Sequence, residues 1–441
     1  MGADKSLRQM AYEVLYEVLE EGKFIHQVLG AMLRKYQYLD KKDRAFVARL
    51  CEGCVEQAIY LDYVIDCYSK TKTTKMKPQI RTILRMGAYQ ILSMEGVPDS
   101  AACNESVKLA VQKGFHGLKG FVNGVLRTVA REKERIALPD SEKDPAKYLS
   151  VRYSAPAWLV SYWSEWLGNE KAEQILAASQ GASALHIVVN TKKTTAKDLA
   201  EELSGEGITY VPDPDLPNAG CLTGVDHLQK VKAFQRGDFF VQDHSCTEAV
   251  YAAGIRPGDT VVDLCSAPGG KAALAALLAG EEGRVLSRDL TEEKCDKIRE
   301  NMDRLGLTTV EVKARDARIT DPELPAGRKV FLADLPCSGL GVIGRKNDIK
   351  YHASSEGIAS LQKLQREILT AAAASCRPGD VLLYSTCTVT KEENAQNAAW
   401  FADAFPFEKE TEKQILPGRG ADGFYYARFV CRGESAVRED E

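Results

Sequence analysis

Apolar residues recur at helical spacing in the first part of the chain, up to about residue 134. The clearest run is Leu7, Met10, Ala11, Val14, Leu15, Val18 and Leu19. The same period continues through 46–65, 80–92, 101–111 and 121–129, while Gly and Pro collect between these segments. We therefore predict an all-α domain over residues 1–137, with about five or six helices.

The next part of the chain mixes helical and strand patterns. Residues 137–155 carry Pro, Asp, Ser and Lys without a period and predict a linker. Beyond them, 158–176 has a helical pattern, 185–189 that of a strand and 196–203 that of a second helix. These patterns predict a small α+β subdomain over residues 155–235.

Strands alternate with helices from residue 236 onward. Strand patterns cover 260–264, 284–287, 310–312, 330–333 and 381–385, and helical patterns cover 292–305 and 360–374, among others. This alternation predicts a parallel, doubly wound α/β domain of the Rossmann-like type over residues 236–432. Ligands of such sheets bind beyond the carboxyl ends of the strands.

Composition narrows the class of protein. A chain of 441 residues is long enough for two or three domains, and its formal net charge of −4 argues against coating nucleic acid by bulk electrostatics. No apolar run is long enough to cross a bilayer, and the first residues, MGADKSLRQM, lack the apolar region of a signal peptide. We expect a cytoplasmic protein that acts as a monomer and does not associate with membranes.

The cysteines and histidines do not indicate a metal site. The twelve cysteines are scattered without an export signal, which favours reduced thiols. Cys51 and Cys54 form a C-x-x-C inside a helical pattern, with no second ligand pair nearby, so core packing is favoured over zinc. The six histidines show no ligand spacing, and we predict no metal.

One local stretch is basic. No acidic residue occurs between Asp66 and Glu95, where the basic residues are Lys70, Lys72, Lys75, Lys77, Arg81 and Arg85. The charge alone allows two interpretations: an RNA-contacting surface, or a solvated loop leading to a helix start at Pro78.

The first strand of the α/β domain leads into a glycine-containing loop. This loop and the helix start after it comprise Cys265, Ser266, Ala267, Pro268, Gly269, Gly270 and Lys271. Paired glycines let the backbone approach a ligand, and Asp289 at the end of the next strand is placed to accept hydrogen bonds from ribose hydroxyls. A dehydrogenase-type dinucleotide site is the alternative. Because G-x-G-x-x-G and G-x-x-x-x-G-K-[ST] are both absent, S-adenosylmethionine is the favoured cofactor, and Asp316 could hold its adenine amine.

Two cysteines follow the fourth and fifth strands of this domain. Cys337 lies in Asp334-Leu335-Pro336-Cys337, and Cys387 lies in Ser385-Thr386-Cys387. A lone thiol is more often a core residue, but two thiols at ligand-binding strand ends favour reactivity. Carbon 5 of cytosine becomes nucleophilic only after a thiolate adds at carbon 6. Asp334 suits hydrogen bonding at N3, and a second thiol can assist the final elimination.

The motifs CSAPGGK, DLPCSG, YSTCT and DGFYYARF, between about residues 237 and 432, resemble those of bacterial RNA 5-methylcytosine methyltransferases of the Sun/Fmu (RsmB) type. This family modifies small-subunit ribosomal RNA. The resemblance implies that Cys387 is the nucleophile and that Cys337 aids product release. It also implies that 265–271, Asp289, Asp316 and Asp334 contact the methyl donor, and we count Lys271 and Asp334 as catalytic.

The N-terminal part, including LRMGAYQILSMEGVPDSAACNESVKLA, resembles the NusB-like antitermination fold. The resemblance implies RNA binding by this domain, and we expect small-subunit ribosomal RNA as the partner. Leu335, Arg315, Asn347 and Tyr351 depart from common family residues. The segment that holds Asn347 and Tyr351 is expected to meet the RNA through Arg345, Lys346 and Lys350. The rival interpretations are a non-catalytic RNA-binding protein and a nicotinamide oxidoreductase.

Overall fold

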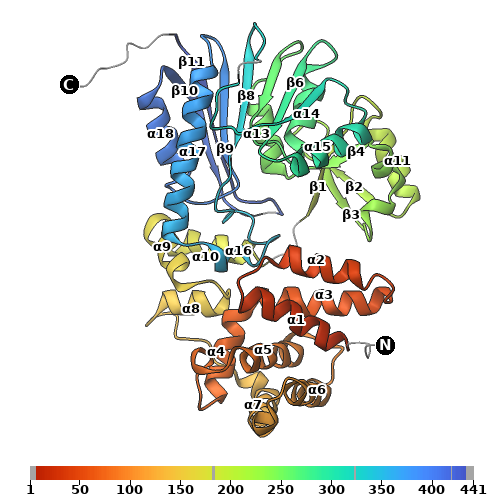
Figure 1. The fold of residues 1–441 in the computed structure, drawn as a ribbon, viewed down its shortest axis with the longest axis vertical. Coiled ribbons are helices and arrows are strands. Elements are labelled where there is room, and N and C mark those ends of the chain that lie inside the picture. Colours follow the sequence, from red (N-terminus) through yellow and green to blue (C-terminus); the bar gives the residue numbers. More distant parts are fainter. Residues whose placement is uncertain (1–5, 181–183, 322–323, 419, 434–441) are drawn as a thin grey trace, which may run out of the picture. The chain divides into compact units, whose positions relative to one another are not determined.

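The structure is a computed structural model, and it describes residues 6–180, 184–321, 324–418 and 420–433. The first five residues, on which part of the expectation about export rests, lie outside these ranges. The chain divides into two compact units, shown in Figure 1. The first comprises Met1–Gln180 with Arg345–His352, and the second Gly181–Gly344 with Ala353–Glu441. In the described ranges, no helix is both long and apolar enough to cross a membrane.

The first unit is helical, as predicted. Ser6 begins α1 with a capping box, in which its Oγ accepts a hydrogen bond from the Gln9 N–H and its own N–H donates to Gln9 Oε1. The α-helices are α1 (Leu7–Leu19), α2 (Ile25–Lys35), α3 (Lys41–Glu56), α4 (Ala58–Tyr68), α5 (Pro78–Ser93), α6 (Asp99–Gln112), α7 (Lys119–Glu132), α8 (Pro145–Arg152), α9 (Ala157–Leu167), α10 (Asn169–Ala178) and α16 (Ile349–His352). Short 3-10 turns lie at Thr73–Lys75, His116–Leu118 and Lys133–Arg135.

Two features of this unit bear on the sequence predictions. Helices α9 and α10, predicted inside the segment 155–235, are grouped with the first unit rather than with the strands that follow. Cys51 and Cys54 are fully buried, and each Sγ lies near a backbone carbonyl oxygen, those of Ala11 and Arg85. This is the environment of small core residues.

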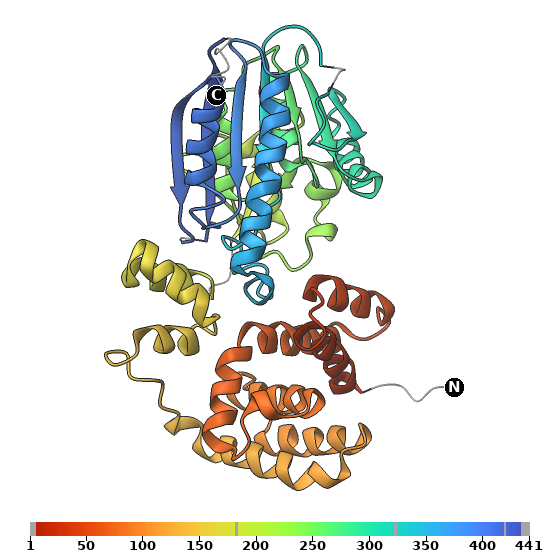
Figure 2. The same cartoon turned by 60° about the vertical axis from the view of Figure 1, so that its left-hand side comes forward.

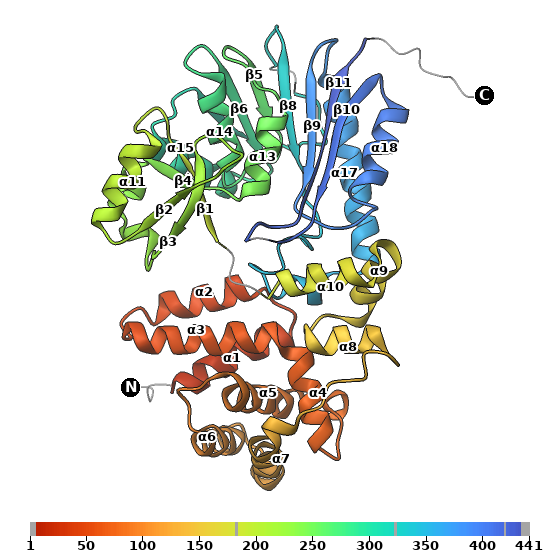
Figure 3. The ribbon, with the colours of Figure 1, turned by 180° about the vertical axis from the view of Figure 1, so that it is seen from behind.

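The second unit begins with a four-stranded antiparallel sheet in the order β2-β3-β1-β4. Its elements are β1 (Leu185–Val189), α11 (Ala196–Gly205), β2 (Thr209–Pro212), β3 (Ala219–Thr223), a 3-10 turn (Leu228–Lys230), α12 (Lys232–Arg236) and β4 (Phe239–Val241). Helix α11 lies beside this sheet (Figure 3). Its Leu199 and Leu203 are buried in the same core as residues of the strands. The small α+β prediction is confirmed, although β4 extends the sheet past residue 235.

The larger sheet has seven strands in the order β10-β11-β9-β8-β5-β6-β7. Its strands are β5 (Thr260–Asp263), β6 (Arg284–Asp289), β7 (Val310–Ala314), β8 (Lys329–Asp334), β9 (Val381–Thr386), β10 (Phe407–Ile415) and β11 (Phe424–Cys431). Strands β5 to β9 run parallel, and the β10–β11 hairpin adds antiparallel to β9. The predicted Rossmann-like sheet is therefore present, with strand ends that extend as far as Asp289 and Asp334.

Helices cover both faces of this sheet because its strands alternate their buried side chains between two cores. One core joins the sheet to α13 (His244–Ala252), α14 (Gly270–Ala279) and α15 (Glu292–Leu305). The other joins it to α17 (Ser355–Ser375) and α18 (Ala395–Ala404), which Figure 2 shows lying along the sheet. Strand order reverses between β5 and β8, so ligands are expected beside the carboxyl ends of these two strands.

Candidate active site

The two predicted thiols lie together at the carboxyl ends of neighbouring strands. Strands β8 and β9 are parallel partners, with Asp334 opposite Ser385, so the segments that follow them leave the sheet side by side. Cys337 Sγ lies 3.3 Å from Cys387 Sγ, and neither cysteine forms a disulfide within the described residues. The hydrogen bond to Cys387, followed by burial, raises the pKa of Cys337 well above its ordinary value. The structure thus brings together the residues that the sequence separates.

A lysine–aspartate pair lies at the end of β8. Lys271 Nζ donates to Asp334 Oδ2 at 2.7 Å, and Ser385 Oγ donates to Asp334 Oδ1 at 2.9 Å. Burial is the largest single effect and lowers the pKa of Lys271, but the charge of Asp334 and its hydrogen bond, together with Cys246 and Asp263, outweigh it, and the net shift of this pKa is upward. Because both Asp334 oxygens accept hydrogen bonds, Lys271 is the proton-carrying member of the pair. Lys271 and Asp334, both of which were expected to be catalytic, therefore lie within hydrogen-bond distance of each other.

A buried glutamate supports the loop that carries Cys337. Glu393 is fully buried, and its carboxylate accepts hydrogen bonds from the Ser338 N–H at 2.8 Å and the Ser338 hydroxyl at 2.5 Å. Thr390 Oγ1 and Gln365 Nε2 also donate to it, at 2.9 and 3.1 Å. The sequence analysis missed Glu393, because nothing in the local pattern indicates that this carboxylate turns inward.

The predicted cofactor loop lies between β5 and α14. Gly269 has a φ of +104°, a conformation that favours glycine, and a Cβ at Gly270 would lie 2.9 Å from Gln242 Oε1. Asp289 faces this loop: its carboxylate accepts from the Ala267 N–H at 2.9 Å, and also from the Leu290 N–H and Lys294 Nζ. Cys265 and Ser266 lie in the same loop, with the Ser266 N–H donating to the Arg288 carbonyl oxygen.

Two further carboxylates differ in their surroundings. Asp263, the last residue of β5, is buried, and neither of its carboxylate oxygens has a hydrogen-bond partner among the described residues. Burial raises the pKa of Asp263 to about 7. Asp316 instead pairs with Arg318 at 2.6 Å, and this hydrogen bond lowers its pKa. An orphaned buried carboxylate at a ligand-binding strand end fits a cationic ligand, and sequence reasoning did not single out Asp263.

The surroundings explain two of the residues that differ from the common family residues. Leu335 is buried in the core beneath α17. Arg315 Nη2 donates to the Thr320 carbonyl oxygen at 2.8 Å.

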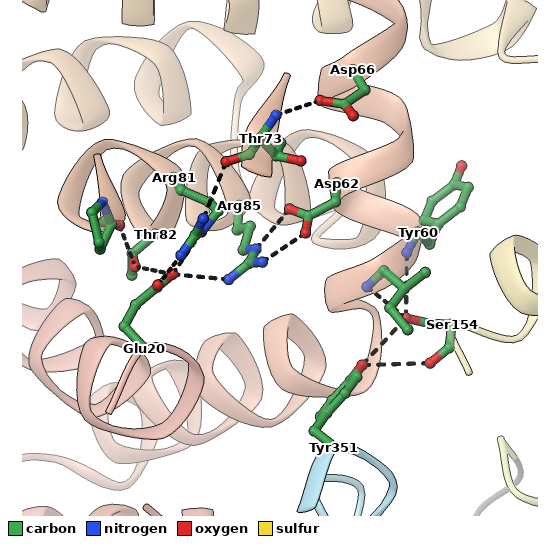
Figure 4. Close-up of polar contacts among 12 residues, drawn as sticks. Glu20, Tyr60, Asp62, Asp66, Thr73, Arg81, Thr82, Arg85, Ser154 and Tyr351 are labelled. Carbon is green, nitrogen blue, oxygen red and sulfur yellow. Dashed lines mark hydrogen bonds and ion pairs between the residues drawn. The ribbon is translucent and has the colours of Figure 1, made fainter. Parts of the chain in front are cut away.

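The basic stretch divides into an exposed and a buried part. Lys70, Lys72, Lys75 and Lys77 are exposed. Arg81 and Arg85 point inward: Arg81 pairs with Glu20, and Arg85 with both Glu20 and Asp62 (Figure 4). The two arginines therefore belong to an internal ion-pair network, and only the four lysines are available to RNA.

The segment 345–352 is largely packed into the first unit. Asp348 Oδ2 accepts from the Ile25 N–H at 2.7 Å, and the Tyr351 hydroxyl donates to the Val55 carbonyl oxygen at 2.9 Å (Figure 4 shows Tyr351). Lys350 is buried and donates to the Glu56 carbonyl oxygen at 2.8 Å. This corrects the expectation that Lys350 meets RNA. Arg345 and Lys346 are exposed, and Asn347 is half-buried.

Comparison with known proteins agrees with this architecture. The profile of 16S rRNA methyltransferase RsmB/F matches residues 250–430, that of the NusB family matches 5–131, and that of the RsmF/B-like ferredoxin-like domain matches 155–226. Among solved structures, PH0851 covers 97% of this chain and 99% of its own, with a TM-score of 0.78 at 24% identity. NSun6 from Pyrococcus horikoshii, solved with SFG, covers 63% of this chain and 99% of its own, with a TM-score of 0.58 at 21% identity. These two structures show the fold.

Relatives of known family match nearly the whole chain. The probable ribosomal RNA small subunit methyltransferase B of Bacillus subtilis is 32% identical over 446 residues, covering 97% of this chain and 98% of the relative. Ribosomal RNA small subunit methyltransferase B of Klebsiella pneumoniae is 30% identical over 440 residues, with 97% and 98% covered. The chain therefore belongs to the RsmB/F family of S-adenosylmethionine-dependent ribosomal RNA methyltransferases.

Proposed function

We propose that this protein methylates carbon 5 of a cytosine in 16S ribosomal RNA, with Cys387 as the nucleophile and Cys337 as the residue that resolves the adduct. The observation that carries the proposal is the 3.3 Å approach of the two thiols beside the Lys271–Asp334 pair. A core position would explain one thiol, but it gives no reason for two half-buried thiols to meet beside a half-buried ion pair at the ligand-binding edge of the sheet.

The two thiols divide the work between them. The thiolate of Cys387 adds to C6 of cytosine, and the electrons of the C5=C6 bond move toward N3, which makes C5 nucleophilic. When bound, S-adenosylmethionine supplies the methyl group that C5 receives. Solvent water then takes the C5 proton, and the electron pair of the C5–H bond re-forms the C5=C6 double bond. The C6–S bond breaks with its electron pair returning to Cys387, and Cys337 assists by donating its proton to the leaving sulfur. The 3.3 Å contact between the two sulfur atoms supports this division, because one thiol can keep its proton while the other reacts as a thiolate.

The ion pair is suited to the polar edge of the base. The Lys271 ammonium can donate a hydrogen bond to the negative charge that develops at N3 and O2, while the Asp334 carboxylate can accept one from the exocyclic amine. The upward pKa shift of Lys271 keeps it protonated at neutral pH. A nicotinamide oxidoreductase would not require this arrangement beside two thiols.

The methyl donor would be held at the carboxyl ends of β5 and β6. The loop 265–270 offers backbone N–H groups, Asp289 offers carboxylate oxygens for a ribose, and Asp316 is proposed for the adenine. The unpartnered carboxylate of Asp263 fits a cofactor that carries positive charge. NSun6 was solved with SFG, an analogue of S-adenosylmethionine, which supports this choice of donor for the same fold.

RNA would meet the helical unit at its exposed lysines. Lys70, Lys72, Lys75 and Lys77 form one cluster around the 3-10 turn before α5, and we include Arg345 and Lys346 as further contacts. The 5–131 match to the NusB family supports an RNA-binding role for this unit. We propose that the protein acts as a monomer in the cytoplasm.

The nature of the product tests this proposal. Full-length protein is incubated with unmethylated 16S ribosomal RNA and S-adenosylmethionine, and the RNA is analysed by nucleoside mass spectrometry and bisulfite sequencing. We expect 5-methylcytosine at one position, and no product when the RNA or the donor is omitted. A different methylated nucleoside would overturn the assignment of carbon 5 while leaving the family intact.

A further inference from the structure

Three potential metal ligands meet in the second unit. His186 lies on β1, Asp213 directly follows β2, and His244 is the first residue of α13. Each offers one ligand atom, and these three atoms all lie within 4.8 Å of one another. Cys221 on β3 pairs with His186 across the sheet, and its Sγ lies 3.1 Å from His186 Nδ1. Their wide separation in the sequence explains why ligand spacing did not reveal them.

Hydrogen bonds around the cluster orient the ligand atoms. His186 Nε2 lies 3.2 Å from the Gly420 carbonyl oxygen, which can only accept, so Nε2 carries the hydrogen and Nδ1 keeps a lone pair facing Cys221. Asp213 Oδ1 accepts from the N–H groups of Asp215 and Leu216 at 2.9 and 3.0 Å. Its other oxygen, Oδ2, thereby faces His244 Nδ1 at 2.6 Å. Protein metal sites commonly hold their histidines and carboxylates through such outer hydrogen bonds.

The chemistry of the three groups selects the ion. Two imidazoles and one carboxylate suit a borderline divalent ion such as zinc, whereas magnesium and calcium favour sets made of oxygen ligands. The side chains of Asp213 and His244 are 7% and 25% exposed, so the cluster is largely shielded but reachable by an ion. We propose that His186, Asp213 and His244 bind one zinc ion, with water as its fourth ligand.

The ion would act as a structural tie. It would join β1 and the turn after β2 to the first residue of α13. Two residues further along, Cys246 Sγ lies 3.6 Å from Lys271 Nζ, so α13 also contacts the ion pair at the active site. Zinc would therefore stabilise the small sheet and hold α13 in place, independently of which base is methylated.

Metal content and affinity test the site directly. Full-length, tag-free protein is stripped with a chelator, and zinc is titrated back by calorimetry. We expect one ion per chain, and we expect His186→Ala and Asp213→Asn to weaken binding at least a hundredfold. His227→Ala is the control, because His227 is an exposed histidine of the same unit outside the cluster. Circular dichroism confirms that each variant is folded before titration.

Cobalt identifies the ligands. The Co²⁺ form of the wild type should show the strong visible bands of a tetrahedral site, and folded His244→Ala should lose them. Less than stoichiometric zinc, or unchanged affinity in folded His186→Ala, would overturn the site. Visible bands that survive unchanged in folded His244→Ala would overturn the assignment of His244.

Discussion

The Glu393 carboxylate accepts hydrogen bonds from both the backbone N–H and the hydroxyl of Ser338, the residue directly after Cys337. Glu393 thereby fixes the loop on which the second thiol stands. The same carboxylate is held by Thr390 and Gln365, so the loop is anchored to α17 and to the segment after β9. Glu393 is a positioning residue in this account, since it acts on the reaction through Cys337.

Replacing Glu393 should uncouple the two halves of the reaction. Glu393→Gln keeps the size of the side chain but offers one acceptor oxygen for donors that now use two, at a cost of about 1–3 kcal/mol in stability. We expect slower release of methylated RNA, with adduct formation less affected. Rapid-quench measurement of both steps tests this, and Glu367→Gln, at an exposed position of α17, is the matched control. Equal slowing of both steps would indicate a purely structural role.

The exposed lysines before α5 should carry RNA affinity. Changing Lys72, Lys75 and Lys77 to Gln should weaken RNA binding and reduce the salt slope by about one unit per lost phosphate contact. Affinity for the methyl donor should not change. Filter binding over a range of salt concentrations measures the effect. Changing the exposed Lys143, Lys147 and Lys171 of the same unit to Gln is the control for net charge. Identical slopes in both variants would remove this cluster from the RNA surface.

Asp289 should determine affinity for the methyl donor. Loss of its carboxylate removes a proposed ribose contact and the acceptor that holds the Ala267 N–H. Asp289→Ala should therefore raise the donor Kd roughly tenfold to a hundredfold, since a hydrogen bond to a charged group is worth about 1.5–3 kcal/mol. Calorimetry measures the Kd, with Asp296→Ala on the exposed face of α15 as control. Wild-type affinity in Asp289→Ala would contradict the placement of the cofactor.

Asp263 should make stability fall with rising pH in the cofactor-free protein. Its pKa is about 7 in the fold, against about 3.9 in an unfolded chain. Between these two pH values the unfolded chain binds fewer protons than the folded protein. The contribution of Asp263 to stability is therefore fully present below about pH 4 and is lost as the pH rises through about 7. In the wild type this pH-dependent fall in the free energy of unfolding amounts to up to about 4 kcal/mol, and Asp263→Asn should remove it. Urea unfolding at several pH values tests it, with exposed Asp303→Asn as control. The same pH dependence in Asp263→Asn and wild type would refute the argument.

The sequence predicted most of the architecture because its signals are local. Helical periodicity located the first unit, strand–helix alternation located the Rossmann-like sheet, and the motifs around Cys337 and Cys387 fell at strand ends that the fold places side by side. The burial of a charged side chain and its contacts with distant parts of the chain could not be predicted from such local signals. Arg81, Arg85 and Lys350 look like surface cations in the sequence, yet the first two pair with buried acids and the third donates to a backbone carbonyl. Glu393 could not be found for the same reason.

The most direct measurement of the central claim compares the two thiols, because the mechanism assigns them opposite phenotypes. Purified Cys387→Ser and Cys337→Ala are incubated with 16S ribosomal RNA and S-adenosylmethionine and analysed by denaturing electrophoresis. Cys387→Ser should form no covalent complex and no product, since no thiolate adds at C6. Cys337→Ala should accumulate a protein–RNA complex that resists denaturation and needs the methyl donor, and the double variant should trap nothing. Trapping by Cys387→Ser, with neither complex nor product from Cys337→Ala, would reverse the roles, and full activity in both variants would contradict the covalent mechanism.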